Sequence, residues 1–166
     1  MKGKTRVLVA LVMVVAVLAA FVPAAGLAEG NKTYFSGSEC WVADLAPGIW
    51  EPLGNGTFRV TGMAQQFRDE TDDPRTTGDT QIVVNAVLDP ATGSGPMHGT
   101  FEIVNGQGSW SGHWVGRLDN WAGSIHAAGH GSGAYEGLVA YWTYSRPGPW
   151  ACFVVDGYIV ETGAGE

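Results

Sequence analysis

The chain has 166 residues, enough for one domain of ordinary size, with 9 basic and 16 acidic residues and a net charge of −7. An acidic protein is a poor electrostatic partner for nucleic acid or anionic lipid, so these two classes of partner are largely excluded. Hydrophobic residues make up 45% of the chain and aromatic residues 11%, which excludes wholesale disorder.

The chain begins with a segment typical of an export signal. Its first six positions hold three basic residues, Lys2, Lys4 and Arg6. An almost purely aliphatic run follows over 7–22, Pro23 ends it, and the small residues that follow fit cleavage after Ala28. The run is shorter than the roughly 20 residues that span a bilayer, which argues against the alternative of a retained anchor. We therefore predict a cleaved signal peptide over 1–28 and a secreted protein, extracellular or periplasmic, with one domain over 29–166.

Two cysteines, Cys40 and Cys152, lie near opposite ends of the predicted mature chain. An even pair in an exported protein predicts one disulfide. It would close a loop of over 100 residues, for which the chain-entropy model gives a stabilisation of up to about 4.7 kcal/mol. Two buried free thiols are the alternative.

Short stretches in which apolar and polar residues alternate recur along the chain, and no stretch has the spacing of an amphipathic helix. Eight stretches are predicted as strands, over 39–44, 57–68, 80–89, 97–104, 109–118, 122–129, 134–145 and 150–161. Turn residues separate them, and Asn105-Gly106 carries the strongest signal for a type I′ hairpin. Connections of two to five residues permit only antiparallel neighbours. We predict an all-β fold, an eight-stranded antiparallel up-and-down β-barrel, with a β-sandwich as the alternative.

Alternation along each strand indicates which side chains face the interior. Six aromatic residues take predicted inward positions: Phe58, Phe101, Trp110, Trp114, Tyr135 and Tyr141. Glycines alternate with larger side chains over 110–116 and 135–141, which suits a narrow barrel. Because eight strands leave room for side chains or one small ligand, the six are the predicted lining of an apolar cavity. A barrel filled by its own rings is the alternative.

Two segments share a rhythm of glycines and aromatic residues, GSWSGHWVG over 108–116 and GHGSGAYEGL over 129–138. This pattern resembles small secreted bacterial β-barrels of the allene oxide cyclase and dirigent-like kind, over about a quarter of the mature chain. The resemblance implies an eight-stranded barrel with a largely apolar cavity, often oligomeric. The only part of the family's pattern that can be matched to this chain is a turn, formed by Gly131, Gly133, Tyr135 and Gly137. No catalytic residue of the cyclases or dirigent proteins can be matched.

Two groups of residues are candidates for metal binding. Four histidines, His98, His113, His126 and His130, could supply zinc ligands, with surface histidines as the alternative. The acidic run over 69–79 could hold calcium in a loop, although its spacing departs from the EF-hand pattern. We predict no metal and no cofactor, and leave calcium at the acidic run as an open alternative.

Patterns that carry catalysis are missing from the sequence. No serine stands at the centre of a nucleophile elbow, and Glu102 and Glu136, the strand-interior acids, take polar-side positions. We therefore predict a non-enzymatic secreted binder of a small apolar or aromatic ligand. An enzyme of the cyclase or isomerase kind is the alternative, and a cavity-facing ionisable group with a perturbed pKa would mark it. Because the last two predicted strands are apolar on both faces, a homo-oligomer with a structural or adhesive extracellular role is a third possibility.

Overall fold

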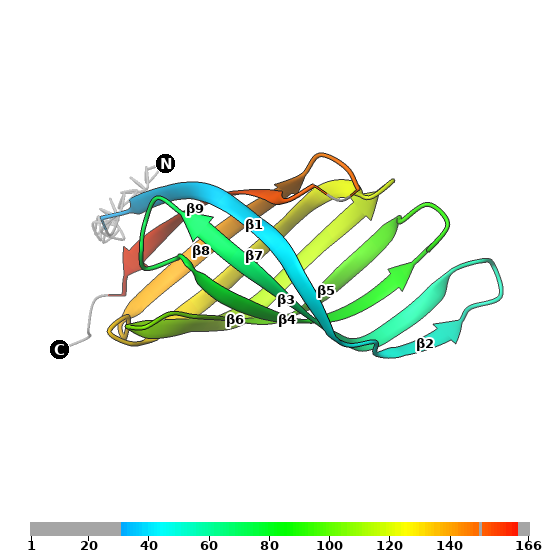
Figure 1. Cartoon of the computed structure of the whole chain (residues 1–166), viewed down its shortest axis with the longest axis horizontal. Helices are drawn as coiled ribbons and strands as arrows, with labels where there is room; N and C mark the ends of the chain where they lie inside the picture. The colour runs from blue at the N-terminus through cyan, green and yellow to red at the C-terminus, as the bar shows by residue number, and fades with distance from the viewer. Residues whose placement is uncertain (1–30, 150, 163–166) are drawn as a thin grey trace, which may run out of the picture.

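The computed structural model describes residues 31–149 and 151–162, which form a β-barrel without helices (Figure 1). The strands of this part are β1 (Thr33–Ala46), β2 (Ile49–Pro52), β3 (Phe58–Thr71), β4 (Gly78–Leu88), β5 (Gly95–Val104), β6 (Gly108–Asp119), β7 (Ala122–Gly133), β8 (Leu138–Arg146) and β9 (Phe153–Glu161). From β3 to β9, each strand pairs antiparallel with the next, and β1 closes the ring between β9 and β3. The predicted eight-stranded up-and-down barrel is confirmed, with β2 as one extra strand on β3.

The predicted signal peptide over 1–28 lies outside the described residues. Within the described part, no helix has the length and hydropathy needed to cross a membrane.

Several strand boundaries differ from the prediction, and one strand was not predicted. β1 begins at Thr33 rather than at 39. The additional residues pair with β9, and from Gly37 also with β3, which keeps them in a strand. Their small polar side chains gave no apolar–polar alternation from which the strand could be predicted. β2 was not predicted because all four of its residues are exposed, and an exposed strand needs no alternation of apolar and polar residues. β8 begins at Leu138 rather than at 134, since 134–137 form a turn in which Gly137 has a φ of 81°.

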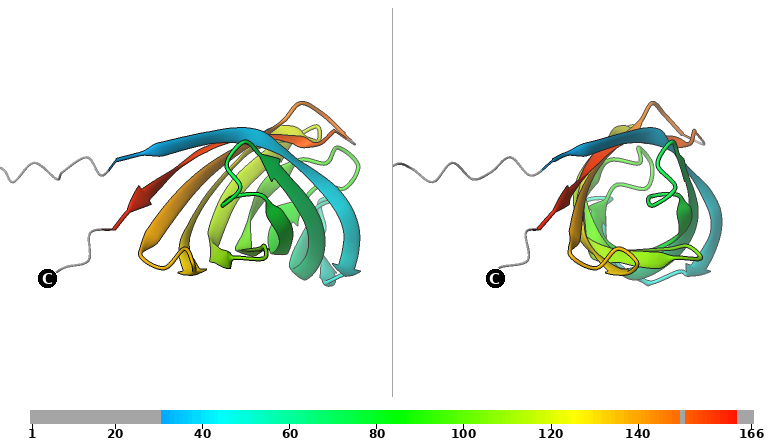
Figure 2. Two further views of the ribbon diagram at one scale, coloured as in Figure 1. Left: turned by 60° about the vertical axis from the view of Figure 1, so that its left-hand side comes forward. Right: turned by 90° about the vertical axis from the view of Figure 1, so that its left-hand side faces the viewer.

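The up-and-down order places alternate connections at the same end of the barrel (Figures 1 and 2). One end carries the connections 72–77, 105–107 and 134–137, and we call it the plugged end. The other end carries the connections 89–94 and 120–121, the corner between β1 and β2, and the β8–β9 connection. We call it the open end.

Asn105 ties the plugged end together. Its side-chain amide donates hydrogen bonds to carbonyls of the 72–77 connection, at 3.0 Å for Thr77. Its side-chain oxygen accepts a bond of 2.7 Å from the Tyr135 hydroxyl and bonds from two backbone amides of its own turn. The predicted type I′ turn at Asn105-Gly106 is wrong, because neither residue has a positive φ and the Asn105 side chain shapes the turn instead.

Aromatic rings fill the middle of the barrel. The Trp142 ring is met edge-on by Phe101 at 5.2 Å, by Trp110 at 5.7 Å and by Phe35 at 6.0 Å between ring centroids. Tyr135 stacks on Trp110 at 5.3 Å. Such pairs contribute about 0.5–1.5 kcal/mol each beyond the burial of their surface. The rings therefore hold the barrel wall together from inside.

Candidate functional site

A pocket of about 400 Å³ opens at the open end of the barrel. It is lined by Cys40, Trp41, Asp44, Gln65, Phe67, Trp121, Arg146, Ala151, Cys152 and Phe153. A neighbouring hollow of about 460 Å³ shares Asp44, Gln65 and Trp121 with it and adds Trp50 and Met63. Volumes of this size, with mostly apolar walls and a few polar groups, are typical of small-molecule sites.

The disulfide forms part of the pocket wall. Cys40 of β1 and Cys152 of the β8–β9 connection are bonded, as predicted, although 112 positions separate them in the chain. The bond ties the connection to the strand that closes the barrel, and so holds two sides of the pocket together. Disulfides of this kind are typical of proteins in oxidising compartments.

A strained turn brings a tryptophan to the pocket. Asn120 and Trp121 join β6 to β7 with φ values of 52° and 63°, as a type I′ turn requires. This conformation costs a residue with a side chain roughly 1–2 kcal/mol, and Trp121 lacks the local hydrogen bonding that helps asparagine. The indole lies where a Cβ on Gly93 would be, and its backbone N–H donates to the Gly93 carbonyl at 3.2 Å. Strain held by its surroundings is often found at functional sites, and here it places a large ring in the pocket wall.

Arg146 supplies the positive charge of the pocket. Its guanidinium lies over the Phe153 ring, 5.4 Å from the centroid, and its Nε donates to the Gly148 carbonyl at 3.0 Å. Among the described residues no carboxylate forms an ion pair with it. The acid of the pocket, Asp44, instead accepts a bond of 2.8 Å from the Gln65 amide. The terminal nitrogens of Arg146 are therefore donors that the pocket can offer to a ligand.

Two buried carboxyl groups lie next to the pocket wall. Glu39 and Asp69 are direct partners across β1 and β3, and are 7% and 0% exposed. Glu39 also pairs with Phe153 of β9, and Asp69 follows Phe67 on the same inner face of β3. The Thr80 hydroxyl donates to Asp69 Oδ2, while Oδ1 has no hydrogen-bond partner in the described part of the chain.

Burial sets the ionisation of this pair. It raises the pKa of Asp69 to about 7, against the opposing effects of the Thr80 hydrogen bond and the charge of Arg68. Burial, and then the neighbouring Asp69 carboxylate, raise the pKa of Glu39 well above its usual value. Burial also raises the pKa of the Tyr144 hydroxyl, with smaller contributions from the charges of Asp69 and Glu39. Each group is therefore favoured in its uncharged form.

Both acids were missed from the sequence. Glu102 and Glu136 were the acids predicted within strands, at polar-side positions, and both are exposed as those positions imply, although Glu136 lies in the 134–137 turn rather than in a strand. A bulge in β3 between Val60 and Met63, with Gly62 at a φ of 67°, inserts an extra residue and reverses which positions face inward. Past the bulge, odd-numbered residues point inward, so Asp69 enters the barrel. Alternation continued from the buried Phe67 would have identified it.

The six predicted cavity residues divide into three groups. Four are buried in the barrel and none of them lines the open-end pocket: Phe101, Trp110, Trp114 and Tyr135. Phe58 is half-buried and meets the Trp50 ring of β2 edge-on at 6.0 Å. The inward position predicted for Tyr141 is wrong, because the turn at 134–137 shifts the alternation and points Ala140 inward, leaving Tyr141 40% exposed outside. The sequence therefore predicted most of the aromatic core of the barrel but none of the residues that line the open-end pocket as ligand contacts.

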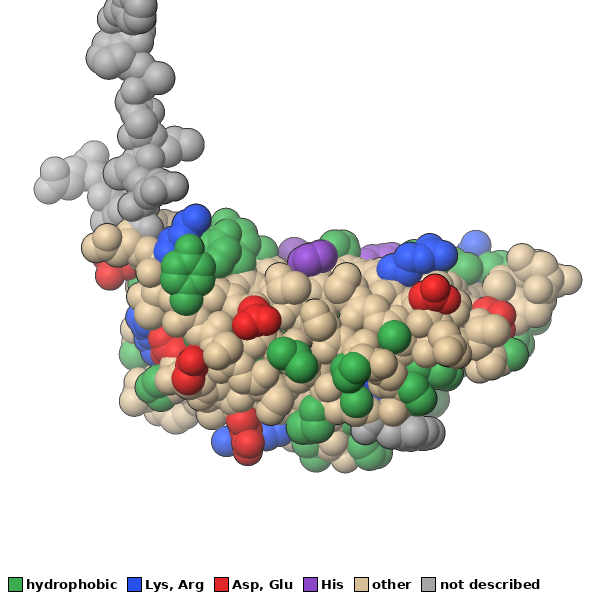
Figure 3. Space-filling model, turned by 90° about the horizontal axis from the view of Figure 1, so that it is seen from above, with side chains coloured by type: hydrophobic (Ala, Val, Ile, Leu, Met, Phe, Trp, Pro, Cys, Tyr) green, Lys and Arg blue, Asp and Glu red, His purple; other side chains and the backbone are tan. Residues whose placement is uncertain are grey.

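The metal candidates do not converge. All four histidines are exposed on the outer wall, and histidine side chains are visible on the face in Figure 3. The acids of the 69–79 run have separate surroundings: Asp69 bonds Thr80, Asp72 bonds Ser36, Asp73 pairs with Arg75 at 2.7 Å, and Asp79 pairs with Arg68 at 2.9 Å. Among the described residues, no group of three or more histidine, cysteine, aspartate or glutamate side chains is placed to hold a metal ion.

No family model, curated protein or solved structure matches the chain. The resemblance to allene oxide cyclase and dirigent-like barrels therefore stays a prediction from two short segments.

Proposed function

We propose that this protein binds a small molecule with an aromatic or apolar body and an anionic group, in the pocket at the open end of its barrel. The observation that carries the proposal is Arg146. Its guanidinium stacks on Phe153 in an aromatic wall, and within the described residues no acid pairs with it. A carboxylate or sulfonate on a ligand would complete its hydrogen bonding.

The pocket divides its contacts between the two parts of such a ligand. The rings of Trp41, Phe67 and Trp121 offer apolar surface, whose burial contributes about 25 cal/mol per Å² removed from water. The planar guanidinium of Arg146 matches two oxygens of an anionic group, and charge-assisted bonds are about twice as strong as neutral ones. Stacking on Phe153 fixes the guanidinium before the ligand arrives, which lowers the entropy lost on binding.

The alternative of an enzyme draws support from the buried acids. Glu39 and Asp69 have the perturbed pKa values expected of acid–base groups. Neither residue lines the pocket, however, and Phe67 and Phe153 form the wall beside them. A proton-transfer role requires direct reach to the substrate, so this arrangement supports binding more than catalysis.

We also propose that the protein acts outside the cytoplasm. The Cys40–Cys152 disulfide supports an oxidising compartment. The export-type start of the sequence, with its basic residues and aliphatic run, supports secretion.

The test compares two probes of the same shape. Isothermal titration with 1-naphthoate and with uncharged 1-naphthalenemethanol measures the contribution of the anionic group. We expect Arg146→Gln to weaken naphthoate binding about tenfold or more, because a hydrogen bond to a charged group contributes about 1.5–3 kcal/mol, and to leave the alcohol unaffected. Arg117→Gln, which removes an exposed arginine on β6, is the matched control. Equal naphthoate affinity in wild type and Arg146→Gln, or no binding to either, would refute the proposal.

A further inference from the structure

Three tyrosines form a row across the outer wall of the barrel. Tyr141 of β8, Tyr158 of β9 and Tyr34 of β1 are direct partners in the pairing of these strands. Their ring centroids are 5.0 Å apart for Tyr141 and Tyr158, and 5.9 Å for Tyr158 and Tyr34. Tyr34 is 71% exposed and Tyr141 is 40% exposed, so the row presents aromatic surface to solvent. We call these three residues the tyrosine row.

A polar row runs beside it, two residues away from the tyrosine on each strand. It consists of Thr143 of β8, Asp156 of β9 and Ser36 of β1, again direct partners in the strand pairing. Asp72 holds Ser36 in place, since its carboxylate accepts bonds from the Ser36 amide at 2.8 Å and the Ser36 hydroxyl at 3.1 Å. No hydrogen bond within the described residues uses the Asp156 carboxylate, so its acceptors remain free for a ligand.

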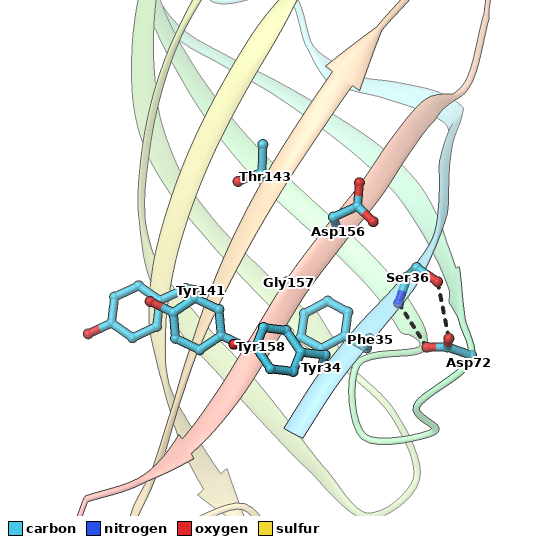
Figure 4. Close-up of a pocket in the computed structure, with 9 residues that line it drawn as sticks. All are labelled: Tyr34, Phe35, Ser36, Asp72, Tyr141, Thr143, Asp156, Gly157 and Tyr158. Carbon is cyan, nitrogen blue, oxygen red and sulfur yellow. Dashed lines mark hydrogen bonds between the residues drawn. The ribbon is translucent and has the colours of Figure 1, made fainter. Parts of the chain in front are cut away.

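A groove of about 410 Å³ lies over these two rows and over Gly157 between them (Figure 4). One long side of the groove is therefore aromatic and the other carries hydroxyl and carboxylate groups. Exposed apolar patches that are rimmed by polar residues mark binding sites more often than isolated exposed rings do. The groove is distinct from the pocket at the open end, because no residue lines both the groove and that pocket.

We propose that this groove binds a neutral glycan on the outer wall of the barrel. A pyranose ring has C–H groups on its faces and hydroxyls around its edge. Tyr158 is stacked on Tyr141 and has the Lys32 ammonium over its ring, 4.9 Å from the centroid, so the exposed rings of Tyr34 and Tyr141 are the ones that offer aromatic surface to the C–H groups. The acceptors of the polar row suit the hydroxyls. Adjacent strands lie about 4.8 Å apart, so the three strands offer contacts along a chain of sugars rather than to a single ring.

Charge selects this occupant over two others. The groove carries the carboxylates of Asp72 and Asp156 against one ammonium, that of Lys32 over Tyr158, and the chain has a net charge of −7. In a symmetric dimer built on this face, each patch meets its own copy, so two patches with an excess of negative charge face each other. An anionic lipid surface is repelled for the same reason. A neutral polyol has hydroxyl donors for the carboxylates and carries no opposing charge.

Affinity electrophoresis of the protein in gels that contain soluble β-glucan, xylan or chitin oligosaccharides tests the proposal. We expect retardation by at least one of these glycans, and we expect Tyr141→Ala and Tyr34→Ala each to weaken it about tenfold. Asp156→Asn, which keeps the shape of the side chain, should weaken it several-fold. Trp50→Ala, which removes an exposed ring from β2 at the open end of the barrel, is the control and should leave retardation unchanged.

Two further measurements separate the outcomes. Urea unfolding midpoints close to that of the wild type show that Tyr141→Ala and Tyr34→Ala fold, whether or not naphthoate binds. Unchanged naphthoate binding by the two variants shows in addition that the two sites are distinct. Sedimentation velocity reports self-association. The proposal is overturned if none of the glycans retards the wild-type protein, if the tyrosine variants are retarded equally, or if the row instead mediates a dimer that Asp156→Asn strengthens.

Discussion

Replacing Asp69 by asparagine should make the stability of the barrel less dependent on pH. The amide has nearly the shape of the carboxyl group, can still accept the hydrogen bond from Thr80, and cannot ionise. In the wild type, burial raises the pKa of Asp69 from 3.8 to about 7. The folded protein therefore holds this proton over a pH range in which the unfolded chain has already lost it.

The sign and size of the effect follow from this difference. The favourable contribution is fully present below about pH 3.8, declines as the pH rises, and is lost once the pH passes about 7. Each pH unit of that range corresponds to about 1.36 kcal/mol, so the wild type should lose up to about 4 kcal/mol in its free energy of unfolding. Glu39, whose pKa is raised by burial and by Asp69, adds a loss of the same sign.

Urea unfolding followed by tryptophan fluorescence, at about pH 5 and about pH 8, measures the part of this loss that falls above pH 5. Asp69→Asn should reduce it by about 2–3 kcal/mol, since about two pH units separate pH 5 from the folded-state pKa, and should be more stable than the wild type at the higher pH. The exposed Glu102→Gln is the matched control and should behave like the wild type. Asp73 does not interfere, because its hydrogen bond with Arg75 lowers its pKa and moves its effect below this window. A wild-type free energy of unfolding that is the same at both pH values would refute the reasoning.

Three further predictions concern the two ends of the barrel. Gly93→Ala should lower naphthoate affinity and destabilise the protein by roughly 1–3 kcal/mol, because the new methyl group overlaps the Trp121 ring; calorimetry and urea unfolding measure the two effects. Asn105→Ala should cost about 2–4 kcal/mol in urea unfolding, since it leaves partners at the plugged end unpaired, whereas Asn55→Ala in the exposed β2–β3 connection should cost less. Thiol titration of the denatured, unreduced protein should detect no free thiol, and reduction should lower the unfolding free energy by up to about 4–5 kcal/mol. Two titratable thiols, or equal costs for the two asparagine variants, would contradict these expectations.

The sequence by itself determined the class of fold and the pairing of the cysteines. Period-two alternation and short turns permit only antiparallel neighbours, and that local rule was enough for an eight-stranded up-and-down barrel. With two cysteines in a chain predicted to be exported, one disulfide was the natural pairing, and Cys40–Cys152 is present. Four of the six rings predicted to point inward are buried, because alternation holds wherever a strand is regular.

Only the tertiary structure decided which residues meet at the site. One extra residue in the bulge near Gly62 reverses the alternation in the rest of β3 and brings Asp69 inside. The four-residue turn at 134–137 also shifts the alternation, and it leaves Tyr141 on the outer wall. The pocket joins residues from both ends of the chain, such as Trp41 and Arg146, which become neighbours only when β1 closes the ring. The physical reason is that alternation is a local property of a strand. Bulges, ring closure and the pKa of a buried acid depend on contacts between segments far apart in the chain.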